Sequence, residues 1–144
     1  MELIKTHVEF RSDSFPITDK EKEEWDGQVW GYLLAEFISK ELTRCGVHVY
    51  GFLQEDWGYW IELGGEFEDL NLCCNHYEEF ENGFLVFMDP HKPIIRKGFL
   101  KLKKVDISDQ QTKLSNLLEQ ILQNHSDITD IRWWDESDMK LIGG

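Results

Sequence analysis

The sequence lacks positive charge over its central third, since no lysine or arginine occurs between Arg44 and Lys92. The sign then reverses, because the following stretch is basic and contains no acidic residue up to Lys104. Charge segregated in this way creates a field that attracts some partners and repels others, which a stable fold does not require. The central stretch holds ten carboxylates: Glu55, Asp56, Glu62, Glu66, Glu68, Asp69, Glu78, Glu79, Glu81 and Asp89. The basic stretch contributes Lys92, Arg96, Lys97, Lys101, Lys103 and Lys104.

Signals for membranes, secretion and disulfides are also missing. No apolar run is long enough to span a bilayer, and residues 1–5 lead into an alternating pattern instead of the apolar block of a secretory signal. The cysteines are Cys45, Cys73 and Cys74, an odd number, and adjacent cysteines rarely reach disulfide geometry. These absences predict a reduced cytoplasmic protein.

The overall charge restricts the class of partner. With 28 acidic residues against 15 lysines and arginines, the net charge of −13 argues against direct binding of nucleic acid and against an anionic membrane. It favours a basic protein partner, or a surface that is only solvated. We expect a monomer or a weak homodimer.

Complete catalytic motifs are absent from the sequence. There is no Gly-x-Ser-x-Gly nucleophile elbow, no phosphate-binding P-loop and no Gly-x-Gly-x-x-Gly. A hydrolase or metal-dependent enzyme would have to be assembled from His48, His76 and Glu55, with Cys73 as a nucleophile if it were exposed. We therefore expect no catalytic residues, and the enzyme remains an alternative.

A zinc site is the one metal centre that the composition suggests. Cys45-x-x-His48 and Cys74-x-His76 together have the residue types of a Cys₂His₂ site, but neither half has a usual zinc-finger spacing. Buried thiols and surface histidines are the simpler interpretation. We expect no metal and no cofactor.

What the sequence does contain is enough apolar surface for one folded domain. Its 144 residues are 41% hydrophobic and include six tryptophans and nine phenylalanines. Apolar periodicity predicts the order β-α-β-β-β-β-α-β within residues 1–136, followed by a tail at 137–144. The predicted class is α+β, with a mostly antiparallel sheet and both helices on one of its faces.

The individual elements follow from period-2 and period-3.6 patterns. Gly64-Gly65 and Asn82-Gly83 predict tight hairpin turns, and Thr18–Glu21 and Ser108–Gln111 predict capping boxes. The segment Pro90–Lys104 is predicted to be mostly loop, with a short helix or strand inside it. Strands are predicted at 4–10, 47–53, 57–63, 70–75, 84–88 and 128–134, and helices at 30–45 and 114–122.

The aromatic residues suggest an interaction surface. Alternation predicts that Trp57 and Tyr59 face the core, whereas Trp60 lies on the opposite face. If Trp60 and Trp134 both lie on the face without helices, they form an aromatic patch rimmed by carboxylates. The alternative is that the segment Pro90–Lys104 folds over this face and buries them.

Two interpretations are open for the basic segment. Arg96 and Lys97 are candidates for binding a phosphate or carboxylate ligand, since arginine can make bidentate contacts. The other interpretation is that the segment pairs with the acidic stretch of its own molecule or of a second copy.

Four short parts of the sequence stand out together: Glu55-Asp56-Trp57-Gly58, Asn82-Gly83 with Phe84-Leu85-Val86-Phe87, Pro93 followed by Ile95-Arg96-Lys97, and Ile131-Arg132-Trp133-Trp134. Together they resemble a group of small bacterial cytoplasmic proteins to which no function is attached. The resemblance covers Phe10 to Asp135 and supports a single cytoplasmic domain. The chain departs from the group after Cys74 of the strand predicted at 70–75, where the group often has glycine and this chain has Asn75.

These features favour a non-catalytic acidic module that binds a basic protein. The most concrete version is an inhibitor or immunity protein that neutralises a cationic, nuclease-type partner. A nucleic-acid mimic that inhibits a host-defence complex and the small enzyme described above are the alternatives. The predicted partner-binding residues are Glu55, Asp56, Trp60, Glu62, Glu78, Glu79, Arg132 and Trp134.

Overall fold

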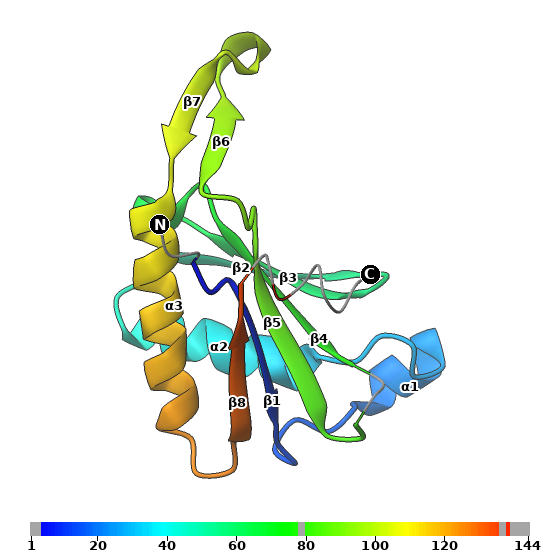
Figure 1. Cartoon of the computed structure of the whole chain (residues 1–144). Helices are drawn as coiled ribbons and strands as arrows, with labels where there is room; N and C mark the ends of the chain where they lie inside the picture. Colours follow the sequence, from blue (N-terminus) through cyan, green and yellow to red (C-terminus); the bar gives the residue numbers. More distant parts are fainter. Residues whose placement is uncertain (1–3, 78–79, 136–137, 139–144) are drawn as a thin grey trace.

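The computed structural model describes residues 4–77, 80–135 and 138, which form a sheet, three helices and a separate hairpin (Figure 1). The tail predicted at 137–144 lies outside these residues except for Asp138. Short 3₁₀ turns occur at Gly65–Phe67 and Phe99–Lys101. The helices are α1 (Asp19–Trp25), α2 (Tyr32–Arg44) and α3 (Ser108–Gln123). The strands are β1 (His7–Arg11), β2 (Val49–Glu55), β3 (Gly58–Leu63), β4 (Asn71–His76), β5 (Gly83–Asp89), β6 (Ile94–Lys97), β7 (Lys103–Asp106) and β8 (Thr129–Trp134).

The predicted α+β class is confirmed. Six strands form an antiparallel sheet in the order β2-β3-β4-β5-β1-β8. The consecutive strands β2 to β5 are neighbours, and the first strand, β1, lies between β5 and the last strand, β8. Strands β6 and β7 form their own two-stranded sheet. The segment Pro90–Lys104 is therefore largely a hairpin, and α1 is a helix in addition to the two predicted.

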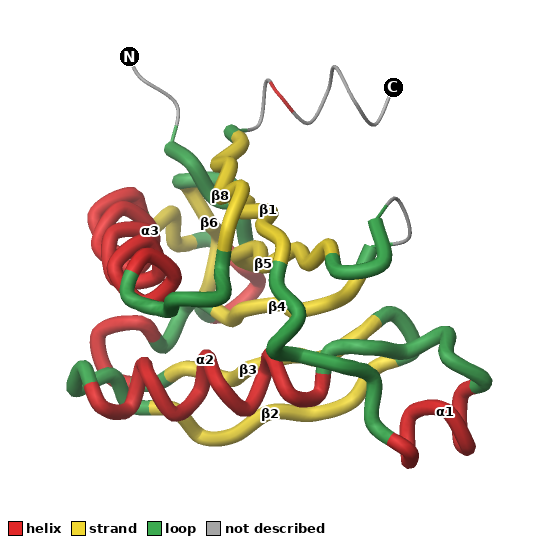
Figure 2. The backbone as a smooth tube through the Cα atoms, turned by 90° about the horizontal axis from the view of Figure 1, so that it is seen from below, coloured by secondary structure: helices red, strands yellow, loops and turns green. Residues whose placement is uncertain are grey.

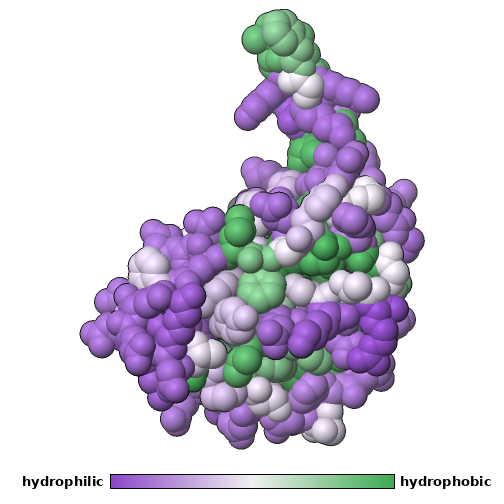
Figure 3. Space-filling model, turned by 180° about the vertical axis from the view of Figure 1, so that it is seen from behind, coloured by the Kyte–Doolittle hydropathy of each residue, from purple (hydrophilic) through white to green (hydrophobic). Residues whose placement is uncertain are grey.

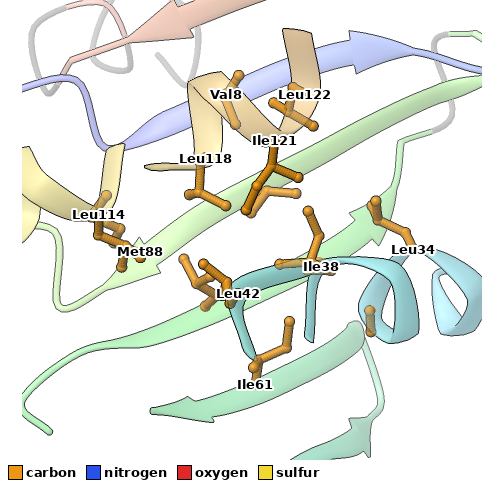
Figure 4. Packing of buried hydrophobic residues seen from close by; sticks show 14 of the residues in the cluster. Val8, Leu34, Ile38, Leu42, Ile61, Met88, Leu114, Leu118, Ile121 and Leu122 are labelled. Atoms are coloured by element: carbon orange, nitrogen blue, oxygen red, sulfur yellow. The ribbon is translucent and has the colours of Figure 1, made fainter. Parts of the chain in front are cut away.

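The core lies between one face of the six-stranded sheet and the helices α2 and α3. Leu34, Ile38 and Leu42 of α2 point toward the same space as Leu118 and the other apolar residues of α3 (Figure 4). Figure 2 shows α2 running alongside β2 and β3, while α3 lies near β8. Both predicted helices thus share one sheet face, which leaves the opposite face for other contacts.

A buried carboxylate joins the start of α2 to α1 and β3. Glu21 is 3% exposed, and the backbone and hydroxyl of Thr18 both donate to its Oε1. The backbone amides of Gly31 and Tyr32 and the hydroxyl of Tyr59 donate to Oε2, at 2.9, 3.1 and 3.0 Å. The first predicted capping box is therefore present. Because a buried charge needs such partners, this network fixes the position of α2 on the sheet.

The second predicted capping box is absent. Helix α3 follows Ile107 without a side-chain cap, and the Ser108 amide instead donates to Asp106 Oδ1 at 2.9 Å. Gln111 is fully buried and donates to the carbonyls of Pro90 and Lys92. These two hydrogen bonds from its amide nitrogen tie the base of the hairpin to α3.

Both predicted tight turns are also wrong. Between β3 and β4 only Gly65 has a positive φ, of 61°, and the chain makes a longer connection through a 3₁₀ turn. Burial of Phe67 and Leu70 in the core draws this connection inward. Gly83 belongs to β5, where it pairs with Arg11, so the β4–β5 connection is longer than two residues.

Candidate functional site

One row of side chains crosses all six strands on the sheet face opposite α2 and α3. The strand registers pair Leu53 with Trp60, Trp60 with Cys73, and Cys73 with Phe87. Phe87 pairs with His7, and His7 pairs with Trp134. We call Leu53, Trp60, Cys73, Phe87, His7 and Trp134 the aromatic row. At about 4.8 Å per strand, Trp60 and Trp134 lie roughly 19 Å apart, which is within the width of a protein interface.

The middle of the aromatic row is buried and its two ends are more open. Cys73 is 2% and His7 is 7% exposed, whereas Leu53 is 55% exposed and Trp60 and Trp134 are half-buried. The imidazole of His7 is stacked on Phe87, with centroids 5.0 Å apart and planes at 5°. Burial lowers the pKa of His7 to about 4, and the neighbouring His91 adds to this effect.

Trp57 lies over this face, although alternation predicts that it faces the core. Its ring centroid is 6.3 Å from that of Phe87, and its side chain is 39% exposed. The reason is that β3 begins at Gly58, so Trp57 belongs to the turn and does not follow the alternation of the strand. Tyr59 is buried as predicted, at 3% exposed. Trp57 therefore adds an aromatic ring that sequence reasoning did not assign to the surface.

The Trp134 end of the row is held by a polar cluster. The indole Nε1 of Trp134 donates to Glu9 Oε1 at 3.1 Å, and the Tyr77 hydroxyl donates to Glu9 Oε2 at 2.9 Å. The guanidinium carbon of Arg132 lies 5.0 Å from the Trp134 ring centroid, and its nitrogen lies 3.8 Å from Glu9. These contacts orient the Trp134 ring and leave Arg132 exposed beside it. Sequence reasoning missed Glu9 and Tyr77, because their role depends on β1 pairing with β8.

Carboxylates lie on both sides of the aromatic row. On one side, Glu62 pairs with Asn71 and Asn71 pairs with Asp89, so these residues form the adjacent row. On the other side, Glu9 lies in the next row and pairs with Arg132. Glu55 ends β2 and Asp56 follows it in the turn, and both are exposed. Glu78 and Glu79 lie outside the described residues. The face therefore combines an aromatic centre with an acidic margin.

The basic candidates lie elsewhere and do not form a common anion pocket. Lys97 donates to both carboxylate oxygens of Asp69, at 3.0 and 3.2 Å. Arg96 is exposed and pairs across the hairpin with Lys104. Adjacent residues of a strand point to opposite faces, which separates Arg96 from Lys97.

The residues of the alternative zinc site and enzyme are not brought together. Cys74 is fully buried as expected, whereas Cys45 follows α2 and is exposed, so the expectation of a buried thiol is wrong there. His76 stacks on Trp30 with ring centroids 3.8 Å apart, and its Nε2 lies 2.8 Å from the Glu81 carbonyl. His48 immediately precedes β2, whereas Glu55 lies at its other end. Within residues 4–77, 80–135 and 138, no group of three or more His, Cys, Asp or Glu side chains is arranged to hold a metal ion.

Cys73 is not a good nucleophile in this position. It is buried, and burial raises the pKa of its thiol to about 12, with Asp89 adding to the shift. A thiol with this pKa is almost entirely protonated near neutral pH. Cys73 is therefore a packing residue of the aromatic row.

Two surface hollows lie away from the aromatic row. One, of about 430 Å³, is lined by Arg11, Asp13, Trp30, Glu81 and neighbouring residues but by no histidine. The other, of about 370 Å³, lies between α2 and α3 and contains Glu41 and His125. Their side chains already have structural partners, because Glu41 pairs with Arg44 at 2.6 Å and His125 Nδ1 accepts from the Asp127 amide. Neither hollow presents a free histidine–carboxylate pair.

Comparison with known proteins identifies no relative: no family model matches the chain, and no curated protein or solved structure matches it. None of the helices in the described part of the chain is long and apolar enough to cross a membrane.

Proposed function

We propose that this protein is a non-catalytic binding module that engages a basic protein with the sheet face opposite α2 and α3. The most specific form of the proposal is a cytoplasmic inhibitor or immunity protein that neutralises a cationic, nuclease-type partner. The aromatic row with its acidic margin is the observation that carries the proposal. Buried aromatic anchors inside a polar rim are the usual arrangement of a protein interface.

The arrangement of the face favours a protein over a nucleic-acid mimic. A mimic needs exposed carboxylates at the regular spacing of phosphates. On this face the side chains that form a continuous row are those of the aromatic row. Glu62, Asp89 and Glu9 each lie two residues from it along their strands, but two are on one side and one is on the other, and Asn71 separates Glu62 from Asp89. The carboxylates are thus suited to steering a cationic partner toward an aromatic contact.

The proposal is tested by capturing partners from the source cell on the immobilised chain and purifying each candidate for titration. We expect a basic protein whose nuclease activity falls when the chain is added in stoichiometric amount. Trp60→Ala should weaken its binding by about 30-fold, the equivalent of roughly 2 kcal/mol. As a matched control, Trp25→Ala removes an exposed ring on α1 and should bind normally. A partner that binds Trp60→Ala and the parent chain equally well would contradict the proposed face.

A further inference from the structure

The β6–β7 hairpin carries the most exposed apolar cluster in the described part of the chain. Phe99, Leu100 and Leu102 at its tip are 86%, 73% and 72% exposed. Figure 1 shows the hairpin projecting away from the sheet and helices. In Figure 3 its tip is hydrophobic and the part below the tip is hydrophilic. A cluster of apolar side chains that is this exposed usually marks a surface that contacts another molecule.

Below the tip, the hairpin places like charges directly opposite one another. Arg96 pairs with Lys104 and Lys97 pairs with Lys103 across the two strands. Such pairs destabilise a sheet unless the charges are compensated. Among the described residues, an ion pair is found for Lys97, with Asp69, and for none of Arg96, Lys103 and Lys104. The hairpin thus holds positive charge that an anionic ligand would compensate.

The base of the hairpin is fixed and its tip is held outward. Ile95 and Val105 pack against the core, and Gln111 binds the backbone just before β6. At the tip, Leu100 and Lys101 have φ angles of 58° and 53°, a left-handed conformation that is uncommon outside glycine. This turn presents the apolar side chains to solvent and does not fold them back onto the strands.

We propose that the hairpin docks this protein on an anionic lipid bilayer, with the tip in the acyl boundary and the cations at the phosphates. The apolar tip projects from the body (Figure 1), so it can enter the acyl boundary while the cations below it stay at the headgroups. Neighbouring strand residues point to opposite faces of the hairpin. One face therefore carries Arg96 and Lys104, and the other carries Lys97 and Lys103. A plane of headgroups surrounds an inserted tip and contacts both faces at once.

The net charge of −13 predicts repulsion from an anionic bilayer, but the charge is unevenly placed. Six of the 15 lysines and arginines lie between Lys92 and Lys104, whereas all 28 acidic residues lie elsewhere. Strand β6 rises roughly 10 Å from Ile94 to Lys97, at about 3.3 Å per residue, and the apolar turn Phe99–Lys101 lies beyond it. This exceeds the screening length of about 8 Å at physiological ionic strength. The Asp69 carboxylate reaches the hairpin, but it is paired with Lys97 at 3.0 Å. The acidic residues that lie farther than the screening length from the tip are largely screened from a surface that the tip touches.

The test is sedimentation of the full chain with vesicles of phosphatidylcholine, alone or with phosphatidylglycerol as about a third of the lipid. We expect binding to the anionic vesicles only, and we expect added salt to weaken it. The tip variant Phe99→Ser/Leu100→Asn/Leu102→Ser should bind at least about tenfold more weakly. The charge variant Arg96→Gln/Lys103→Gln/Lys104→Gln should lose binding to a similar extent.

Matched controls separate the hairpin from general charge and hydrophobicity. Lys20→Gln/Lys22→Gln/Lys40→Gln changes the net charge by the same amount but on α1 and α2, and should bind like the parent chain. Trp25→Ser/Tyr50→Ser removes exposed rings from the body and should also bind normally. Circular dichroism of each variant confirms that it is folded.

Four results would overturn the proposal. The first is no sedimentation with anionic vesicles. The second is an equal loss of binding in the body controls. The third is self-association that depends on the tip, without vesicle binding, which would assign the tip to a second copy of the chain. The fourth is binding of the tip to an acidic protein but not to vesicles. The outcome is independent of the proposed function, because the sheet face is unchanged in every hairpin variant.

Discussion

The imidazole of His7 lies flat on the ring of Phe87, with ring centroids 5.0 Å apart and planes at 5°. The pair lies in the middle of the aromatic row, and His7 is almost completely removed from solvent. The ring centroid of a second histidine, His91, lies 5.9 Å from that of His7, with the two ring planes at 75°. A titratable ring is thus buried between the two ends of the proposed binding face.

This burial predicts an acid-sensitive contribution to stability. The pKa of His7 is about 4 in the folded protein, against about 6.5 in the unfolded chain. Between these values the unfolded chain binds more protons, so stability is complete above pH 6.5 and falls as the pH drops toward 4. The expected loss is about 3 kcal/mol. His7→Phe should remove most of it, as measured by urea unfolding from pH 7 to pH 4.

The control for the acid effect is His48→Phe, because His48 is exposed. It should leave the pH dependence unchanged. Hydrogen bonds from Ser108 and Ser14 lower the pKa values of Asp106 and Asp127. These two carboxylates therefore affect stability only at lower pH, and they do so equally in all the variants. Parallel pH curves for the parent chain and His7→Phe would show that His7 is not responsible.

Two strand glycines with similar backbone angles give a steric prediction. Gly58 has a φ of 156°, and a Cβ there would lie 2.6 Å from the Cys74 carbonyl and 2.7 Å from Asn75 Cβ. Gly51 has a φ of 146°, and a Cβ there would meet nothing within 4 Å. Gly58→Ala should therefore cost about 1–3 kcal/mol more than Gly51→Ala in denaturant melts. Equal losses would mean that β4 moves away without a penalty.

Helix α3 is expected to contribute strongly to the core. Leu118 is 1% exposed, so Leu118→Ala should leave a cavity and lower the free energy of unfolding by about 2–5 kcal/mol. Leu102→Ala makes the same change at a side chain that is 72% exposed and should cost little. A loss below about 1 kcal/mol for Leu118→Ala would contradict the packing of α3 on the sheet.

Charges and rings on the sheet face should act on different steps of binding. Glu55→Gln/Asp56→Asn should slow association and flatten its salt dependence, because exposed rim charges act by long-range attraction. Trp134→Ala should instead speed dissociation by about 30-fold, or roughly 2 kcal/mol, as expected of an interface anchor. Surface plasmon resonance with the captured partner measures both rates.

The control for the charge variant is Glu23→Gln/Glu24→Gln, which removes two exposed carboxylates from α1. Its association rate should change less than that of Glu55→Gln/Asp56→Asn. If the two variants behave alike, the acidic stretch after Arg44 is only a solvated surface. If Trp134→Ala unfolds, the ring belongs to the structure of the sheet and not to a contact face.

The sequence by itself determined the features that depend on near neighbours. The period-2 pattern of β3 and β5 and the apolar stripe of α2 are local, because alternation and helical repeat place side chains on fixed faces. The Thr18–Glu21 capping box is local for the same reason. The separation of an acidic stretch from a basic one likewise follows directly from the order of the residues.

The tertiary structure decided every feature that joins distant segments. Pairing of β1 with both β5 and β8 brings His7 onto Phe87 and Glu9 beside Trp134, across more than seventy positions of chain in each case. Local periodicity carries no information about which strand becomes the neighbour of another. The projecting hairpin was missed because its base is fixed by Gln111 and the core, contacts that lie outside the segment itself. Side-chain burial and hydrogen bonding between distant residues, not local preference, therefore decide where the two candidate surfaces lie.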